Sequence, residues 1–227
     1  MLVELAHEPP AARWERGVLA IGDPTAVAPG DNGVEQTGVN RAAPLAPLPF
    51  AAQEARAVAE IFRDEGTDVL VGTDATRRRW LALQPERYRV LHFAAHARVD
   101  DRHPERTALL LSDGDLDLAA IRAIDIDAQV VTLSACETAL GERVRGEGII
   151  GLPHAFLAAG ARSTVVSLWR VSDQATERFM EDFYRELRAG RSPGVALSDA
   201  RRRRIGESGA GAHPSTWAAF VLVGSSE

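Results

Sequence analysis

Residues 88–95 (YRVLHFAA) and residues 130–135 (VVTLSA) are two short apolar runs that decide the fold class. Each run has almost no polar interruption after its start, which is typical of a strand buried on both faces of a sheet. Strands of this kind occur where helices cover both sides of a parallel sheet. The two runs therefore predict an α/β protein with this pair of strands at its centre.

Working outward from these runs, strand patterns alternate with helical patterns along the rest of the chain. The further predicted strands are 17–21, 69–71, 108–111, 163–168 and 217–223. The predicted helices are 51–65, a helix capped by Thr73 or Asp74 and ending near 84, 118–124, 147–159, 173–189 and 193–205. Asp113-Gly114 predicts a hairpin turn after 108–111. Alternation of this kind indicates βαβ units and a mostly parallel sheet of about six strands, with helices on both faces.

The length of 227 residues favours one large domain. We expect an N-terminal extension over 1–16 and a single domain over 17–227. Residues 25–48 are rich in Pro, Gly and Asn, lack periodicity, and predict a long flexible loop.

The composition narrows the class of function. The net charge is −6 and argues against nucleic-acid binding through phosphate contacts. The arginine runs 77–79 and 201–204 fall in predicted helices, where we expect solvated faces. A single cysteine excludes an intrachain disulfide and suits a reducing cytoplasm. Neither a secretory signal nor an apolar run of about 20 residues is found, so we expect a soluble, cytoplasmic protein without membrane contact.

Reactive side chains follow the ends of several predicted strands, where ligands bind in open parallel sheets. These residues are Asp23, Asp74, His96, Ser134 with Cys136, and Asp173. His96 ends the run VLHFAAH and Cys136 ends the run VVTLSAC. If the two strands are neighbours, both side chains emerge at one edge of the sheet.

A cysteine beside a histidine supports nucleophilic chemistry. The thiolate is the attacking species, and an imidazole can take the thiol proton and then protonate a leaving amine. The backbone N–H groups of Ala97 and Cys136 are candidate donors to an oxyanion. The alternative is that Cys136 is a small buried core residue, because free cysteine is among the most buried residue types.

No cofactor or metal is expected. His92 and His96 have HxxxH spacing, but on a strand they lie roughly 13 Å apart, too far to share a metal. We expect His92 to be a core residue. No GxxxxGK[ST] or GxSxG motif occurs, and Gly146, Gly148 and Gly151 match GxGxxG only by letter, since no strand precedes them. No oxygen-ligand loop predicts a Ca²⁺ site.

Several runs taken together resemble the CHAT family of caspase-like domains. These are residues 88–111 (YRVLHFAAHARVDDRHPERTALLL), 130–141 (VVTLSACETALG) and 145–176 (RGEGIIGLPHAFLAAGARSTVVSLWRVSDQAT). The opening VLAIGDP at 18–24 and the closing WAAFVLVG at 217–224 are similar to the first and last strands of that family. The resemblance spans nearly the whole chain, and the order HFAAH, LSACET, SLWRVSD makes it specific.

The resemblance implies a caspase-like fold, related to separase and the metacaspases, in a family commonly attached to tetratricopeptide repeats in bacteria. It makes His96 the general base and Cys136 the nucleophile of a cysteine endopeptidase. Asp173 matches the position where separase-type relatives place an acid that receives a basic P1 residue, although an acid there also suits a helix cap. Glu147 stands at another helix start and is a second candidate substrate contact.

Three hypotheses of function remain from the sequence. The first is a cytoplasmic cysteine endopeptidase acting on a protein or peptide, with a regulatory domain or activator protein as partner. The second is a catalytically silent signalling or scaffold module, favoured by Ala97 and Ala139, which stand where Gly is frequent in these families. The third is a doubly wound binding domain of the response-regulator or flavodoxin kind, for which Asp23 is the best feature.

Overall fold

The computed structural model describes residues 14–25, 47–100, 103–134, 147–169 and 171–226. Its centre is a six-stranded sheet in the order β2-β1-β3-β7-β8-β9, of which only β9 runs antiparallel to its neighbour. The strands are β1 (Arg16–Pro24), β2 (Thr67–Gly72), β3 (Tyr88–Ala94), β7 (Val130–Leu133), β8 (Ser163–Ser167) and β9 (Phe220–Gly224). The predicted mostly parallel sheet is confirmed, with β3 and β7 at its centre.

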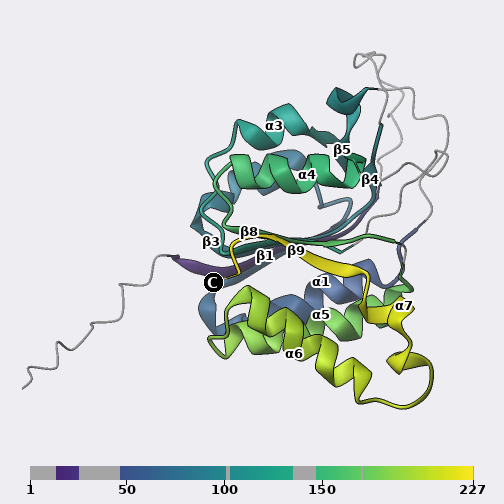
Figure 1. Cartoon of the computed structure of the whole chain (residues 1–227). Helices are drawn as coiled ribbons and strands as arrows, with labels where there is room; N and C mark the ends of the chain where they lie inside the picture. Colours follow the sequence, from purple (N-terminus) through teal and green to yellow (C-terminus); the bar gives the residue numbers. More distant parts are fainter. Residues whose placement is uncertain (1–13, 26–46, 101–102, 135–146, 170, 227) are drawn as a thin grey trace, which may run out of the picture.

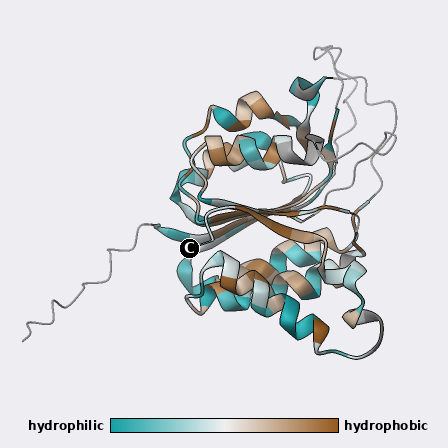
Figure 2. Ribbon diagram, viewed as in Figure 1, coloured by the Kyte–Doolittle hydropathy of each residue, from teal (hydrophilic) through white to brown (hydrophobic). Residues whose placement is uncertain are grey.

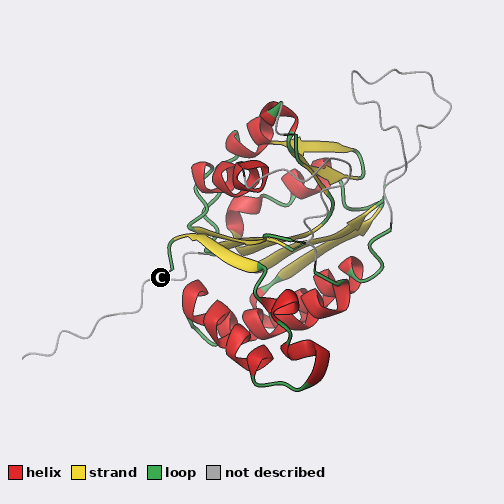
Figure 3. Ribbon diagram, turned by 45° about the vertical axis from the view of Figure 1, so that its right-hand side comes forward, coloured by secondary structure: helices red, strands yellow, loops and turns green. Residues whose placement is uncertain are grey.

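Helices cover both faces of this sheet (Figures 1 and 3). On one face lie α2 (Arg77–Ala82), α3 (Leu118–Arg122) and α4 (Glu147–Ala158), and on the other lie α1 (Ala51–Ile61), α5 (Asp173–Arg188), α6 (Pro193–Ile205) and the short α7 (Pro214–Trp217). Four 3-10 turns, at Arg63–Glu65, Pro85–Arg87, Pro104–Arg106 and Gly209–Ala212, complete the helical segments of the described residues.

The apolar residues of the central strands alternate between these two helical layers. Leu91 and Phe93 of β3 pack with Trp80 and Phe156 on the α2–α3–α4 side. Val90 of β3 packs on the opposite side, in the cluster formed by α1, α5 and α6. In Figure 2 the strands of the sheet are mostly hydrophobic, and the helices on either side mix hydrophobic and hydrophilic residues. Because each strand has a period of two, one buried run supplies both cores.

A second sheet of three strands, in the order β4-β5-β6, was not predicted as such. The hairpin of β5 (Ala108–Leu111) and β6 (Gly114–Asp117) is confirmed, but β4 (Ala97–Arg98) is too short to show a pattern in the sequence. β4 pairs antiparallel with β5, with Ala97 opposite Leu109. This pairing holds the chain directly after His96.

Two of the predicted element boundaries that were wrong have a clear local cause. The helix expected to begin at Thr73 or Asp74 begins at Arg77, because Thr76 is its N-cap and accepts a hydrogen bond from the backbone N–H of Arg79 at 3.1 Å. The last strand begins at Phe220 and not at Trp217, because Pro214 starts the short helix α7.

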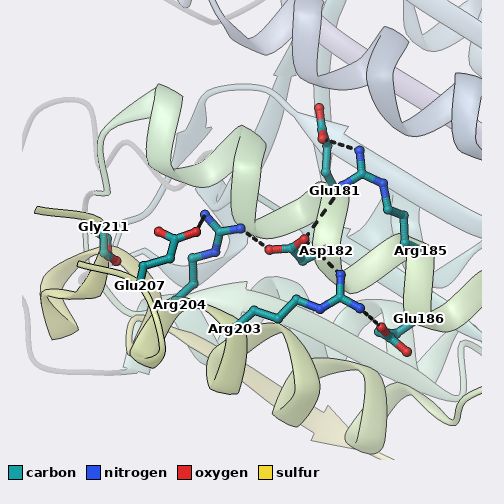
Figure 4. Close-up of polar contacts among 9 residues, drawn as sticks. Glu181, Asp182, Arg185, Glu186, Arg203, Arg204, Glu207 and Gly211 are labelled. Carbon is teal, nitrogen blue, oxygen red and sulfur yellow. Dashed lines mark hydrogen bonds and ion pairs between the residues drawn. The ribbon is translucent and has the colours of Figure 1, made fainter. Parts of the chain in front are cut away.

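The arginine run 201–204 is only in part the solvated face that its helical pattern predicted, because Arg202 and Arg203 are exposed whereas Arg201 and Arg204 are partly buried. Asp182 on α5 is 5% exposed and forms ion pairs with Arg203 and Arg204 of α6 and with Arg185 of α5, at 3.3 Å for Arg203 and 3.7 Å for Arg185. Figure 4 shows these contacts together with those of Glu181, Glu186 and Glu207. These ion pairs hold α6 against α5. The Asp182 carboxylate is buried, and a buried charge destabilises the fold unless it keeps such partners.

We expect the protein to lose stability at alkaline pH because of its two tyrosines, Tyr88 and Tyr184. Burial, and for Tyr88 also the hydrogen bond to Asp68, raises the pKa of Tyr88 and of Tyr184 above the ordinary value of 10.0. Because the folded state holds these protons more tightly, their contribution to stability is complete below pH 10 and declines as the pH rises further. We expect no phenolate absorbance from the folded protein at pH 10, with the signal appearing together with unfolding. A folded protein that is half phenolate at that pH would contradict this.

Candidate active site

The two strands that precede His96 and Cys136 are neighbours, as the sequence argument required. β3 and β7 pair in parallel, with His92 opposite Thr132 and Phe93 opposite Leu133. The last bond of the ladder runs from the backbone N–H of Ser134 to the carbonyl of Phe93, at 3.0 Å. The carboxyl ends of the two strands therefore meet at one edge of the sheet.

His96 lies just beyond the end of β3 and is 2% exposed. Its carbonyl accepts a hydrogen bond from the N–H of Leu110 at 2.9 Å. This bond and the pairing of Ala97 with Leu109 place Ala97 at a non-hydrogen-bonded position of the antiparallel ladder. The N–H of Ala97 is accordingly directed away from β5.

Cys136 and Ala139 lie outside the described residues, and so does the candidate oxyanion donor at the N–H of Cys136. The described segment that contains β7 ends at Ser134, two residues before Cys136. Ser134 is buried, and its hydroxyl lies 3.4 Å from the carbonyl of Phe93. His96 is three residues beyond Phe93, and Cys136 is three residues beyond Leu133. Because Phe93 and Leu133 are partners in register, the two candidate residues follow equivalent points of adjacent strands.

Asp173 and Glu147 are the first residues of α5 and α4, although the structure does not describe their side chains. The N-cap position of α5 is held by Ser172, whose carbonyl accepts a bond from the N–H of Thr176 at 3.0 Å. Asp173 is thus inside the first turn and is not the N-cap residue that the alternative interpretation made it. α5 follows β8, the neighbour of β7, so Asp173 lies at the same edge as His96.

Two other acids that follow strands serve local structure. Asp23 Oδ1 accepts a hydrogen bond from the N–H of Leu48 at 3.1 Å, which holds the chain as it enters α1. Asp74 forms an exposed ion pair with Arg79. Asp23 is near the end of β1 and Asp74 follows β2, and both strands lie on the far side of β3 from β7.

Two large apolar side chains at this edge were missed by the sequence argument. Leu168 and Trp169 directly follow β8 and are 47% and 43% exposed. The backbone N–H of Leu168 donates to Ala219 at 2.9 Å, and the indole N–H of Trp169 donates to the carbonyl of Ser215 at 3.1 Å. The available signal in the sequence was a pair of large apolar residues, Leu and Trp, directly after a predicted strand.

The described part of the chain contains no cluster of three or more His, Asp or Glu residues that could hold a metal ion. In the same residues, no helix is long and apolar enough to cross a membrane. His92, as predicted, is a core residue: it is fully buried, and its ring nitrogens face Tyr184 and Glu54.

The fold is that of caspase-like proteins. Among solved structures, the chain is similar to the Arg-specific cysteine proteinase gingipain R, with a TM-score of 0.61 and 10% identity over 94% of this chain and 47% of that one. It is also similar to separase in the Saccharomyces cerevisiae separase–securin complex, with a TM-score of 0.52 and 14% identity over 92% of this chain and 12% of that one. At these identities the likeness concerns the fold.

The chain belongs to the CHAT domain family, whose model matches residues 3–225. Curated relatives are tetratricopeptide repeat protein 28 of Homo sapiens, 30% identical over 217 residues, and of Mus musculus, 29% identical over 223 residues. Each match covers 79% of this chain, and the chain spans only 8% and 9% of these relatives' lengths.

Proposed function

We propose that this chain is a cysteine endopeptidase in which His96 and Cys136 form the catalytic dyad. The observation that carries the proposal is the register of β3 and β7. It pairs Phe93 with Leu133, and in the sequence the histidine and the cysteine each come three residues after a member of this pair. The position of His96 just beyond β3 supports it, because an imidazole near a thiol can take the thiol proton.

The reaction follows from the chemistry of these groups. The Cys136 thiol gives its proton to the His96 imidazole, and the thiolate attacks the scissile carbonyl carbon. The N–H of Ala97, directed away from β5, and the N–H of Cys136 donate to the developing oxyanion. The His96 imidazolium then protonates the leaving amine, which leaves an acyl-thioester on Cys136 that water hydrolyses.

For the substrate, we propose a protein or peptide with a basic residue before the scissile bond. Asp173 begins α5 at the same edge, where a carboxylate can pair an arginine in bidentate fashion. The likeness to a proteinase described as Arg-specific agrees with this preference. Glu147 at the start of α4 is a second candidate contact, and Leu168 and Trp169 offer an apolar surface to neighbouring substrate residues.

We further propose that the domain acts in a reducing, cytoplasmic compartment under the control of an attached or associated module. The single cysteine must stay reduced to act as a nucleophile. Control by a further module is supported by the relatives, which are named for tetratricopeptide repeats and are more than ten times the length of the matched segment.

The test is cleavage of a mixed fluorogenic peptide library by the purified chain beside Cys136→Ala. We expect cleavage by the parent protein that is lost in Cys136→Ala, with arginine enriched before the cleaved bond. Asp173→Asn should weaken that enrichment and raise KM more than it lowers kcat, since a P1 contact acts mainly in binding. Equal cleavage by both proteins would contradict the proposal. So would silence from both together with failure of an electrophilic peptide to label Cys136, as a scaffold module would behave.

A further inference from the structure

A polar cluster of four residues lies inside the apolar layer between the sheet and the helices α1 and α5. Its members are Glu54 of α1, His92 of β3, Thr132 of β7 and Tyr184 of α5, all between 0% and 4% exposed. Tyr184 donates from its hydroxyl to Thr132 Oγ1 at 2.7 Å, and the hydroxyl oxygen lies 3.0 Å from His92 Nδ1. His92 Nε2 lies 3.3 Å from Glu54 Oε1, a close approach that lacks hydrogen-bond geometry. One chain of contacts thus links two strands and two helices.

This cluster is an unfavourable way to fill a core unless its contacts are kept. Aromatic rings surround it, with Phe62 and Phe183 packed on Tyr184 at centroid distances of 6.0 and 4.9 Å. A carboxyl, an imidazole and two hydroxyls in such surroundings each destabilise the fold if a partner is lost. The packing is therefore sensitive to the relative positions of the four elements in a way that an apolar core is not.

The cluster joins the two strands that lead to His96 and Cys136. His92 and Thr132 are partners in register, and each stands four residues before its candidate catalytic residue. Only the pair of Phe93 and Leu133 follows in the ladder before the strands end.

Backbone bonds alone do not define this alignment, so the packing of side chains on both faces of the sheet must set it. A slip of two residues keeps every side chain on its own face of the sheet and allows a parallel ladder to form again. The same slip would displace His96 relative to Cys136 by about 7 Å. After such a slip, Thr132 and His92 would no longer be opposite each other, and Tyr184 would lose one of its two hydrogen-bond partners.

We propose that His92 and Tyr184 are positioning residues for the dyad, a role that rests on the proposed peptidase function. By holding β3 level with β7, and both against α1 and α5, they set the distance between the His96 imidazole and the Cys136 thiol. Neither residue contacts the substrate, and their effect on the reaction passes through the alignment of the two strands.

The test compares Tyr184→Phe with Tyr88→Phe in the full chain. Both tyrosines are buried and lose the contacts of their hydroxyl, which are with Thr132 and His92 for Tyr184 and with Asp68, at the opposite end of β3, for Tyr88. Thr132→Val, which keeps the shape of the side chain and removes the hydroxyl from β7, is the second test variant. Two quantities are measured: kcat and KM for the best library peptide, and the pH dependence of iodoacetamide alkylation of Cys136, the single cysteine.

We expect Tyr184→Phe and Thr132→Val to lower kcat about tenfold, since small misplacements of reacting groups carry such penalties, with KM changed less than about twofold. The pH profile of alkylation should move toward that of His96→Ala, while Tyr88→Phe keeps the parent's profile and kcat. Equal effects of Tyr184→Phe and Tyr88→Phe on kcat would overturn the inference and leave the peptidase intact.

Alkylation separates the failure of this inference from the failure of the proposed function. If the parent cleaves nothing but its Cys136 profile still depends on His96, a shift in Tyr184→Phe supports the positioning role without peptidase activity. If the parent's profile does not depend on His96, there is no dyad to align, and both proposals are overturned.

Discussion

Replacement of His96 by alanine is expected to lower kcat/KM for peptide cleavage by about 10²–10⁴-fold. The imidazole of this buried residue is the proposed acceptor of the thiol proton and donor to the leaving amine. The residual activity should rise with pH, because the thiol must then ionise without help. The measurement is the pH profile of kcat/KM for the parent and the variant.

His103→Ala is the matched control, since His103 is an exposed loop residue with an ion-pair contact to Glu105 at 3.4 Å. It should keep the parent's rate and pH profile. A thermal unfolding curve of His96→Ala separates loss of chemistry from loss of fold. A variant that stays folded and keeps more than about a tenth of the parent's kcat/KM would show that His96 is not the general base.

Replacement of Gly160 by alanine is expected to destabilise the protein by roughly 2–5 kcal/mol. Gly160 ends α4 with φ of +108°, a backbone conformation that side chains disfavour. A Cβ there would lie 2.1 Å from the carbonyl oxygen of Ile126, whose own N–H donates to Ala159 at 2.7 Å. Neither backbone segment can give way without breaking this junction beside the sheet.

Gly190→Ala is the control for Gly160→Ala, because Gly190 ends α5 in the same way. It has φ of +86°, and a Cβ at this glycine would meet nothing within 4 Å. The two substitutions share the cost of a positive φ, so their difference in unfolding free energy reports the clash with Ile126. We expect Gly160→Ala to be the less stable by about 1–3 kcal/mol, which denaturant unfolding resolves. Equal stabilities would show that the Ile126 segment relaxes freely.

The candidate site could be predicted from sequence to the extent that it depends on strand ends. The apolar runs that precede His96 and Cys136 were each recognisable as buried strands. Whether the two strands are neighbours in the sheet could not be read from the sequence. The structure meets it by pairing Phe93 with Leu133. The candidate oxyanion donor Ala97 is different: the direction of its N–H depends on β4, a strand too short to have a periodic pattern.

The sequence by itself determined the alternation of strands and helices, the two buried central strands and the residues that follow them, because periodicity and apolar runs are local properties of the chain. Only the tertiary structure decided which distant residues meet. Tyr184 reaches His92 across 92 positions and Thr132 across 52, and Arg204 reaches Asp182 from the next helix. Such pairings have no local pattern, because they arise when whole layers pack and each buried polar group must find a partner.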